Sequence, residues 1–322
     1  MKRFVVLLVV ILAVVAIWTG GWFFLAGEVR RNVEALAMAD GVTQPRLTCG
    51  GLNIGGFPFR FDVDCADARV VDGDALIDIA GIRASVLVYR PTHILASAKG
   101  PLAFTDSFTG SKSRVDWSGL EASLRLDGWR VARLSVSGHD LVWTDTLFGE
   151  TLIAQTPLAE LHLLDMPEQH DPERGLAALA IYGTVEDLAY PNMTIAAGDT
   201  KIEAEITALP DDVRRLGEPG MLQRWQADGG TLRLVSLRGT DGASELDAEG
   251  NVALDASGQA EGQINIASSG VAERIGPLLI EPYRTLVLGN PAADGSYANV
   301  LNFRAGGVYS GLIPIAAIPP LF

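Results

Sequence analysis

The residues best suited to chemistry are four histidines and two cysteines. The histidines are scattered and form no ligand-spaced pair: His93, His139, His162 and His170. His139 is followed directly by Asp140, but the two lie in a strand pattern, where neighbouring side chains point to opposite faces. We therefore expect no His-Asp dyad and no metal site.

Other motifs are equally weak. The acidic group at 72–78 lacks the terminal Glu of a calcium loop, so a turn explains it better. Residues 192–194 fit the short glycosylation sequon, which often occurs by chance. The sequence contains no G-x-S-x-G, no P-loop and no G-x-G-x-x-G that opens a βαβ unit. The sequence predicts neither an enzyme nor a cofactor, and a site dispersed over scattered residues is the alternative.

Cys49 and Cys65 stand sixteen positions apart, a separation typical of a disulfide in an exported domain. Closing this loop would contribute about 3 kcal/mol in the chain-entropy model. Between them, residues 55–58 (GGFP) predict a turn, and the alternation at 59–64 predicts a half-buried strand. Two buried thiols are the alternative to the bond. Arg60 with its flanking Asp residues could form a site, although a polar strand face is the simpler interpretation.

Residues 4–26 carry no charge and can cross a hydrocarbon layer of about 30 Å as one helix. Lys2 and Arg3 precede them, which resembles a signal sequence and predicts an exported domain. Cleavage near residues 37–39 is the alternative. We expect an anchor at 1–27, a helical exit at 28–44 and one extracytoplasmic β-rich domain at 45–322. The expected location is therefore the inner membrane, crossed once, with the domain in the periplasm.

The net charge is −14, from 39 acidic and 25 basic residues. Nucleic acids and anionic lipid surfaces attract clustered Lys and Arg, so neither is an expected electrostatic partner.

Short alternating segments separated by Gly, Asp and Ser predict a mainly β, antiparallel architecture. The glycine-rich pattern favours a curled sheet, such as a half-barrel or groove. The apolar face would line it, with Leu232, Leu234, Ile264 and Ile266 as candidates. The strands are expected at 75–79, 82–89, 92–98, 102–104, 115–117, 120–126, 131–136, 141–144, 151–155, 159–164, 178–184, 201–207, 231–238, 244–254, 259–267 and 300–304.

Two helical segments interrupt the strands. Residues 211–227 predict two short helices broken at Gly217 and Pro219, and residues 269–288 predict a kinked apolar helix. The second could be a lid over the groove, with Ile275, Leu278 and Leu279 facing it, or an ordinary core helix. The apolar tail at 311–322 would seal one end of the apolar face or rest on a membrane surface or partner.

Several stretches together resemble the uncharacterised bacterial family catalogued as domain of unknown function 2125. They are the anchor, GGFPFRF (55–61) between the two cysteines, WQADGG (225–230), the G-x-x-A-L-D pattern at 250–255, GLIP (311–314) and PPL (319–321). The resemblance implies an envelope protein and no mechanism. More loosely, residues 229–266 are similar in cadence to AsmA-like envelope proteins, which implies an anchored β-groove associated with lipid movement.

The expected function is therefore a tethered envelope protein that binds or passes lipid through an apolar groove. A scaffolding protein with a closed core and a protein partner is the alternative.

Overall fold

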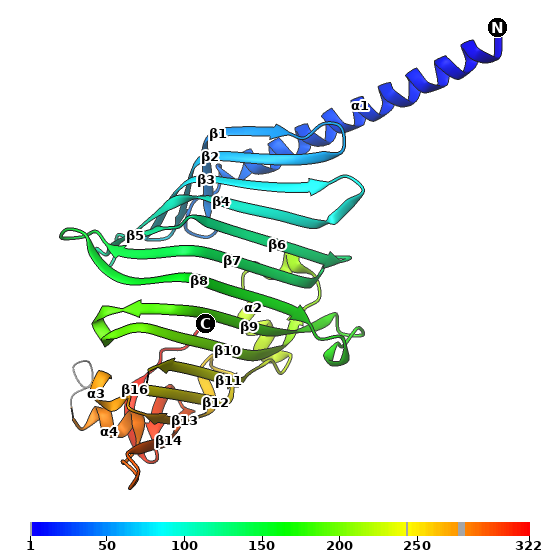
Figure 1. Cartoon of the computed structure of the whole chain (residues 1–322). Coiled ribbons are helices and arrows are strands. Elements are labelled where there is room, and N and C mark those ends of the chain that lie inside the picture. The colour runs from blue at the N-terminus through cyan, green and yellow to red at the C-terminus, as the bar shows by residue number, and fades with distance from the viewer. Residues whose placement is uncertain (1, 243, 276–280) are drawn as a thin grey trace. The chain divides into compact units, whose positions relative to one another are not determined.

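The computed structural model describes residues 2–242, 244–275 and 281–322. Strands dominate, and across these residues sixteen of them form an antiparallel sheet (Figure 1). The predicted mainly β fold with a few helices and one long N-terminal helix is confirmed. The chain divides into two compact units: unit 1 holds residues 1–121 and 144–151, and unit 2 holds residues 122–143 and 152–322.

Unit 1 combines one long helix with a meander of strands. Its elements are α1 (Lys2–Leu36), β1 (Arg46–Gly55), β2 (Arg60–Asp72), β3 (Ala75–Leu87), β4 (Arg90–Asp106) and β5 (Lys112–Asp116), and β6 (Gly119–Asp127) begins in it. Strands β1 to β5 pair in chain order, each antiparallel to the one before.

Helix α1 contains the predicted membrane segment and continues beyond it without a break. It is long and apolar enough to cross a membrane, as either an anchor or a signal sequence would be. Its end is followed by a turn in which Asp40 Oδ1 accepts hydrogen bonds from the backbone N–H groups of Val42 and Thr43, both at 2.9 Å. These hydrogen bonds hold the turn that follows the end of α1 at Leu36.

The predicted disulfide joins Cys49 and Cys65, whose Cα atoms lie 5.2 Å apart. It connects β1 to β2 across the turn at 56–59, also as predicted. On the opposite face of β2 and β3 the polar side chains pair across strands, as Arg69 does with Asp78 at 2.6 Å. Since Arg60 and Asp62 also pair at 2.7 Å with Arg60 exposed, this face is a solvated surface.

Two strands of unit 1 are longer than the sequence predicts. The segments 75–79 and 82–89 merge into β3, and 92–98 and 102–104 merge into β4. Gly100 and Pro101 are typical turn residues, but β4 continues through them with a shift in register. Ile79 pairs with Leu102 and Gly81 with Lys99, so Gly100 and Pro101 together lie opposite one residue of β3. The extra residue is a β-bulge, where proline is tolerated because it needs no ladder hydrogen bond.

Unit 2 contains most of the sheet. Its strands are β7 (Arg130–Asp145), β8 (Thr151–Asp165), β9 (Leu176–Tyr190), β10 (Ile195–Pro210), β11 (Thr231–Asp241), β12 (Ser244–Leu254), β13 (Ala260–Ser269), β14 (Ser296–Arg304), β15 (Gly307–Ser310) and β16 (Ile313–Ala317). They too are hydrogen-bonded in chain order. Gly242 and Gly258, in the turns after β11 and β12, have positive φ, a conformation that glycine adopts without strain.

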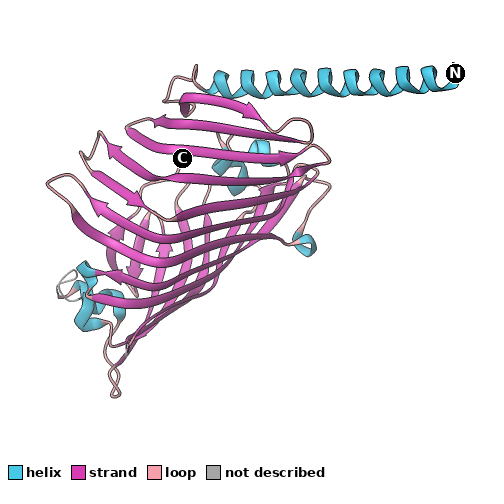
Figure 2. Ribbon diagram, turned by 45° about the horizontal axis from the view of Figure 1, so that its top comes forward, coloured by secondary structure: helices cyan, strands magenta, loops and turns pink. Residues whose placement is uncertain are grey.

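The helical elements of unit 2 are short, as Figure 2 shows in cyan. They are η1 (Pro167–Gln169), η2 (Pro191–Met193), η3 (Val213–Arg215), α2 (Met221–Ala227), α3 (Ala272–Ile275) and α4 (Tyr283–Leu288). The two short helices predicted at 211–227 are present as η3 and α2. In place of one kinked helix at 269–288, β13 extends to Ser269 and two helices follow, and residues 276–280 lie outside the described part.

The apolar tail packs on unit 2 itself. Strand β16 pairs with β15, and beyond it the Leu321 N–H donates to the Gly258 carbonyl at 2.9 Å. The tail therefore lies against the β12–β13 turn.

Candidate functional site

Strands β11 and β13 place the four candidate lining residues on one face of the sheet. Through β12, Leu234 is paired with Gly250 and Gly250 with Ile264. Directly paired residues of antiparallel strands project to the same face, and so do residues two apart. Leu232, Leu234, Ile264 and Ile266 therefore share a face, which we call the apolar face.

The apolar face extends over the neighbouring strands of unit 2. Leu232 pairs with Ile206 of β10, which in turn pairs with Leu179 of β9. In the same way, Leu234 pairs with Ala204, and Ala204 with Ile181. On the other side, Leu301 of β14 pairs with Ile264. Apolar residues thus occupy this face across six strands, from β9 to β14.

A bulge in β11 keeps the apolar face continuous. Leu237 pairs with Ala248, although it is three residues beyond Leu234, which pairs with Gly250. Without the register shift, Leu237 would point to the opposite face. Position 250 requires glycine. A Cβ there would lie 2.2 Å from the Gln263 carbonyl oxygen, because the backbones of β12 and β13 approach too closely for a side chain.

One end of the apolar face is covered by α2. Trp225 is 8% exposed and packs with Leu179 and Leu209 in a buried cluster. Its indole N–H donates to the Thr207 carbonyl at 2.7 Å, which fixes the ring over the ends of β9 and β10. Helix α2 therefore works as a cap at this end.

The other end is covered by α3 and α4. Ala272 and Leu288 are buried together and contact Tyr297 of β14. Arg274 ties α3 to the sheet, since it donates to the Ser244 hydroxyl at 2.9 Å and to the Thr194 carbonyl at 2.7 Å. Of the predicted lid residues, the side chain of Ile275 and all of Leu278 and Leu279 lie outside the described residues, so the lid stays a prediction.

Between the two caps the apolar face is only half-buried. Leu234, Ile264 and Ile266 all have intermediate exposure, and Leu232 is 39% exposed. In the described part of the chain no large side chain falls below 2% exposure. A closed core of this size would bury many such side chains almost fully. Apolar surface therefore remains available in the middle of unit 2.

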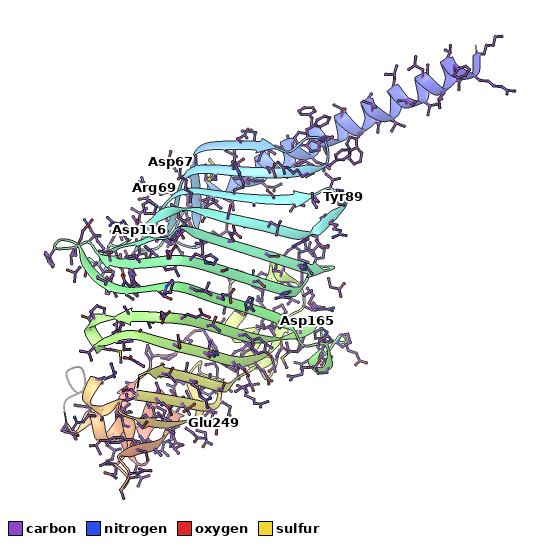
Figure 3. All side chains as sticks on the ribbon, viewed as in Figure 1. Asp67, Arg69, Tyr89, Asp116, Asp165 and Glu249 are labelled. Carbon is purple, nitrogen blue, oxygen red and sulfur yellow. A yellow bond between two sulfur atoms is a disulfide. The ribbon has the colours of Figure 1, made fainter. Side chains whose placement is uncertain are left out.

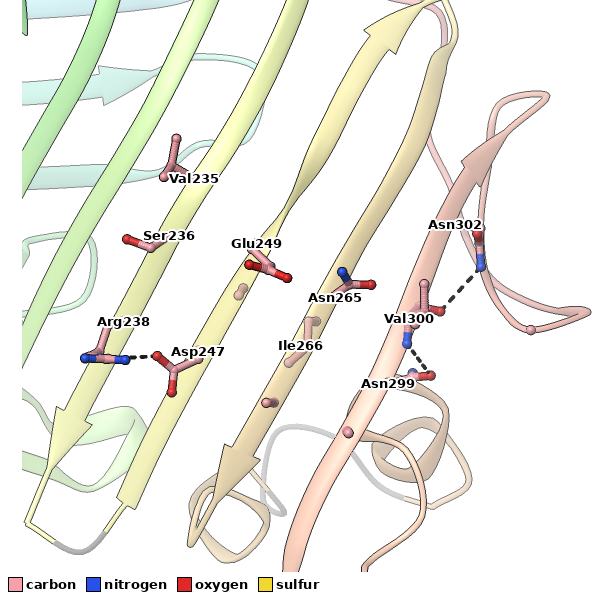
Figure 4. A pocket seen from close by; sticks show the side chains of 14 residues that line it. Val235, Ser236, Arg238, Asp247, Glu249, Asn265, Ile266, Asn299, Val300 and Asn302 are labelled. Atoms are coloured by element: carbon pink, nitrogen blue, oxygen red, sulfur yellow. Dashed lines mark hydrogen bonds and ion pairs between the residues drawn. The ribbon is translucent and has the colours of Figure 1, made fainter.

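The opposite face of β11–β14 is polar and holds an open hollow of about 730 Å³ (Figure 4). Arg238 donates to Asp247 at 2.8 Å, and Glu249 and Asn265 lie beside them. The hydrogen bond to Asp247 raises the pKa of the Arg238 guanidinium, which is charged in any case. Because both partners are well exposed, the pair is a solvated surface feature.

One titratable cluster escapes sequence reasoning. Asp165, labelled in Figure 3, ends β8, and its Oδ1 lies 2.6 Å from Nε2 of His170. Arg130 at the start of β7 donates to Oδ2 of the same carboxylate at 3.1 Å. Asp165 and His170 lie on either side of η1, but Arg130 is 35 residues from Asp165, so no motif in the sequence indicates the cluster. The cluster ties η1 to the strand ends and is explained by that structural role.

The other sequence motifs have plain structural positions. Asp72 and Asp74 flank the β2–β3 turn, and Asn192 lies exposed in η2. His139 contacts the Ser137 hydroxyl at 3.3 Å. Its neighbour Asp140 has φ +50°, so the strict strand alternation assumed for this pair is interrupted there. Over the described residues, no three His, Cys, Asp or Glu side chains gather as metal ligands.

A family model for domain of unknown function 2125, described as an uncharacterized protein conserved in bacteria, matches residues 22–319. No curated protein and no solved structure matches the chain, and the looser similarity to AsmA-like proteins stays a prediction. The match covers nearly the whole chain, so this protein belongs to the family of domain of unknown function 2125.

Proposed function

We propose that this protein is an envelope protein that is anchored by α1 and binds lipid acyl chains on the apolar face of unit 2, without a chemical step. The observation that carries the proposal is the continuous apolar face from β9 to β14, capped at its two ends and half-buried between them.

Apolar surface alone suffices for this kind of binding. Burying one methylene group contributes about 0.8 kcal/mol, so ten methylenes contribute about 8 kcal/mol. Lost translational freedom and chain ordering offset about 4 kcal/mol or more of this gain. The balance supports reversible binding, which suits a protein that takes up and releases lipid.

The location is supported by the disulfide. The Cys49–Cys65 bond would be reduced in a cytoplasm and persists in an oxidising compartment. With α1 as an uncleaved anchor, the sheet would then lie on the periplasmic side of the inner membrane.

The proposal is tested by the lipid that stays with the purified full-length chain. Leu234→Asn with Ile266→Asn places two amides on the apolar face. Val235→Asn with Ala267→Asn places the same amides one residue further along each strand, and is the matched control. We expect phospholipid in the extract of the unaltered chain and of the control, and a several-fold loss in the apolar-face variant, measured by mass spectrometry. A lipid-free unaltered chain, or equal lipid in both variants, contradicts the proposal.

A scaffolding role is the second candidate, and two exposed aromatic residues of unit 1 favour it. Phe108 and Phe148 are 85% and 97% exposed in neighbouring loops, which the hydrogen bond from the Thr146 N–H to the Lys112 carbonyl (3.0 Å) holds together. A photocrosslinker at position 148 should then trap one defined protein in cells, and Phe108→Ser should abolish the adduct. Crosslinking that is unaffected by Phe108→Ser would argue against a shared binding surface.

A further inference from the structure

Helix α1 is docked on its own domain through two tryptophans. The indole N–H of Trp18 donates to the Pro58 carbonyl at 3.1 Å, and that of Trp22 to the Arg60 carbonyl at 3.0 Å. The Trp22 ring is 6% exposed and stacks on Phe61 with a centroid distance of 5.2 Å and an interplanar angle of 8°. In Figure 1, α1 accordingly runs alongside β1 and β2.

These contacts fall within the segment that would span the membrane. At 1.5 Å per residue, Phe4 and Trp18 are about 21 Å apart along the helix, which is less than a hydrocarbon layer of about 30 Å. The remaining part of the hydrocarbon layer, about 9 Å, would be crossed by residues 18–24. The β1–β2 turn, which contacts this part of α1, must then reach into the near side of the bilayer.

The side chains at these strand ends fit such a depth. Phe57, Phe59 and Tyr89 are 47%, 61% and 68% exposed, and Figure 3 shows Tyr89 at the end of β3 and β4. On α1, Phe23 and Phe24 are also exposed. Aromatic residues are enriched at the boundary between hydrocarbon and headgroups, where elements commonly sink 5–10 Å.

A pocket of about 380 Å³ lies at this level between α1 and the strand ends. It is lined by Val14, Ile17, Trp18, Gly21, Trp22, Leu25, Phe61 and Val88. No lining side chain is charged, and both indole N–H groups are already bonded to backbone carbonyls. Its volume is at the small end of the range for ligand sites.

The pocket adjoins the apolar side of the unit 1 sheet. Phe61 pairs with Val86 of β3, and Val86 with Ile94 of β4, so these three side chains share one face. The same face continues along the strands through Val63 and Ala84. An apolar chain in the pocket would therefore meet further apolar surface beyond Phe61.

We propose that this pocket binds one acyl chain of a lipid from the leaflet on the domain side, and is the site at which lipid leaves the bilayer for the sheet. The inference rests on the proposed function and names its substrate class and its point of entry. The occupant follows from the lining: six of the eight lining residues belong to α1, the helix that would span the membrane, so the pocket is exposed to acyl chains and not to water.

Two adjacent glycines of α1 provide a matched test. Gly21 lines the pocket, and Gly20 lies on a different side of the helix, and a Cβ at either position meets no atom within 4 Å. Gly21→Phe therefore fills the pocket, whereas Gly20→Phe adds the same ring to the lipid-facing surface. Val88→Trp fills the pocket from the strand side and leaves α1 unchanged.

The full-length chain is reconstituted in phosphatidylethanolamine vesicles doped with a phospholipid that carries a diazirine in the middle of one acyl chain. After illumination, mass spectrometry measures the adducts on the peptides that contain Phe61 and Val88. We expect adducts on the unaltered chain and on Gly20→Phe, and a several-fold reduction in Gly21→Phe, with Val88→Trp lowering the Phe61 adduct. Equal adducts in both glycine variants, or none in the unaltered chain, overturn the proposal.

The two proposals fail in distinguishable ways. If the apolar-face variants of unit 2 lose their lipid while Gly21→Phe keeps its adducts, lipid binds but does not enter here. If the adducts depend on Gly21 and the purified chain holds no lipid, the pocket holds a chain of the bilayer and the wider binding function is wrong.

Discussion

Asp40 is an exposed carboxylate that holds the turn after α1 together. Hydrogen bonds from the backbone of Val42 and from the side chain of Thr43 hold the pKa of Asp40 well below its usual range. A group whose pKa is depressed on folding stabilises the folded state above its unfolded pKa of about 3.9, and this contribution is lost as the pH falls through the folded pKa.

We therefore expect Asp40→Asn to lower the melting temperature at neutral pH, because the amide accepts these hydrogen bonds less strongly than the carboxylate does. The gap between the two proteins should narrow as the pH falls below about 4. Thermal unfolding of both proteins across this pH range is the measurement. A gap that stays constant with pH would show that the charge of Asp40 has no part in the turn.

The disulfide is the second prediction at this scale. Replacing Cys49 and Cys65 together by serine should lower the free energy of unfolding by about 3 kcal/mol, because the unfolded chain regains the entropy of an open loop. Denaturant unfolding of the variant, and of the unaltered protein with and without reductant, provides the comparison. If reduction leaves the unaltered protein as stable as before, the bond contributes nothing to folding.

At the scale of elements, α1 makes contacts that go beyond the expected anchor. The aromatic residues of the apolar run indicate an interface, and nothing in their spacing distinguishes an interfacial ring from one that docks on a strand some 40 residues later. The structure shows that Trp22 docks on Phe61, so α1 is a fixed part of unit 1 and not a free tether.

This contact predicts a stability effect. Trp22→Ala removes a buried ring and should cost about 3 kcal/mol, the lower end of the range for such truncations. Phe24→Ala is the control, since Phe24 is 64% exposed on the same helix. Thermal unfolding in one detergent measures both. Equal melting temperatures for the two variants would mean that α1 is not docked on the strands.

Helix α2 gives a second prediction for an element. A Cβ at Gly230 would lie 2.2 Å from Trp225, whereas one at Gly217 meets no atom within 4 Å. Gly230→Ala should therefore displace the Trp225 ring and destabilise the fold by about 1–3 kcal/mol, while Gly217→Ala should change little. Tryptophan fluorescence and thermal unfolding measure the two effects. A Gly230→Ala protein as stable as Gly217→Ala would contradict this account of the cap.

The elements also show how far sequence reasoning can go. Local patterns predicted α1, the β1–β2 hairpin, its disulfide and the helices η3 and α2, because each depends on residues close together in the chain. Strand length was wrong at Gly100 and Pro101, since a bulge and a turn use the same residue types. The Arg130–Asp165 contact was missed, since only chain folding brings together two residues 35 positions apart. The lining of the apolar face remains a prediction, although the register places its four residues together.

At the scale of the whole molecule, the membrane topology decides in which compartment the apolar face of unit 2 lies. Lys2 and Arg3 precede the apolar run, and Arg30 and Arg31 follow it, so counting basic residues hardly favours either orientation. The disulfide favours export, because a cytoplasmic domain would hold both cysteines reduced. Orientation therefore has to be measured directly.

Two reporters fused after Phe322 provide that measurement. Alkaline phosphatase folds only where its own disulfides form, and a fluorescent protein that folds in the cytoplasm serves as the reciprocal control. We expect an active phosphatase fusion and a dark fluorescent fusion, because the domain would lie outside the cytoplasm. The opposite pair of results would place unit 2 in the cytoplasm, and an envelope role for the domain would be wrong.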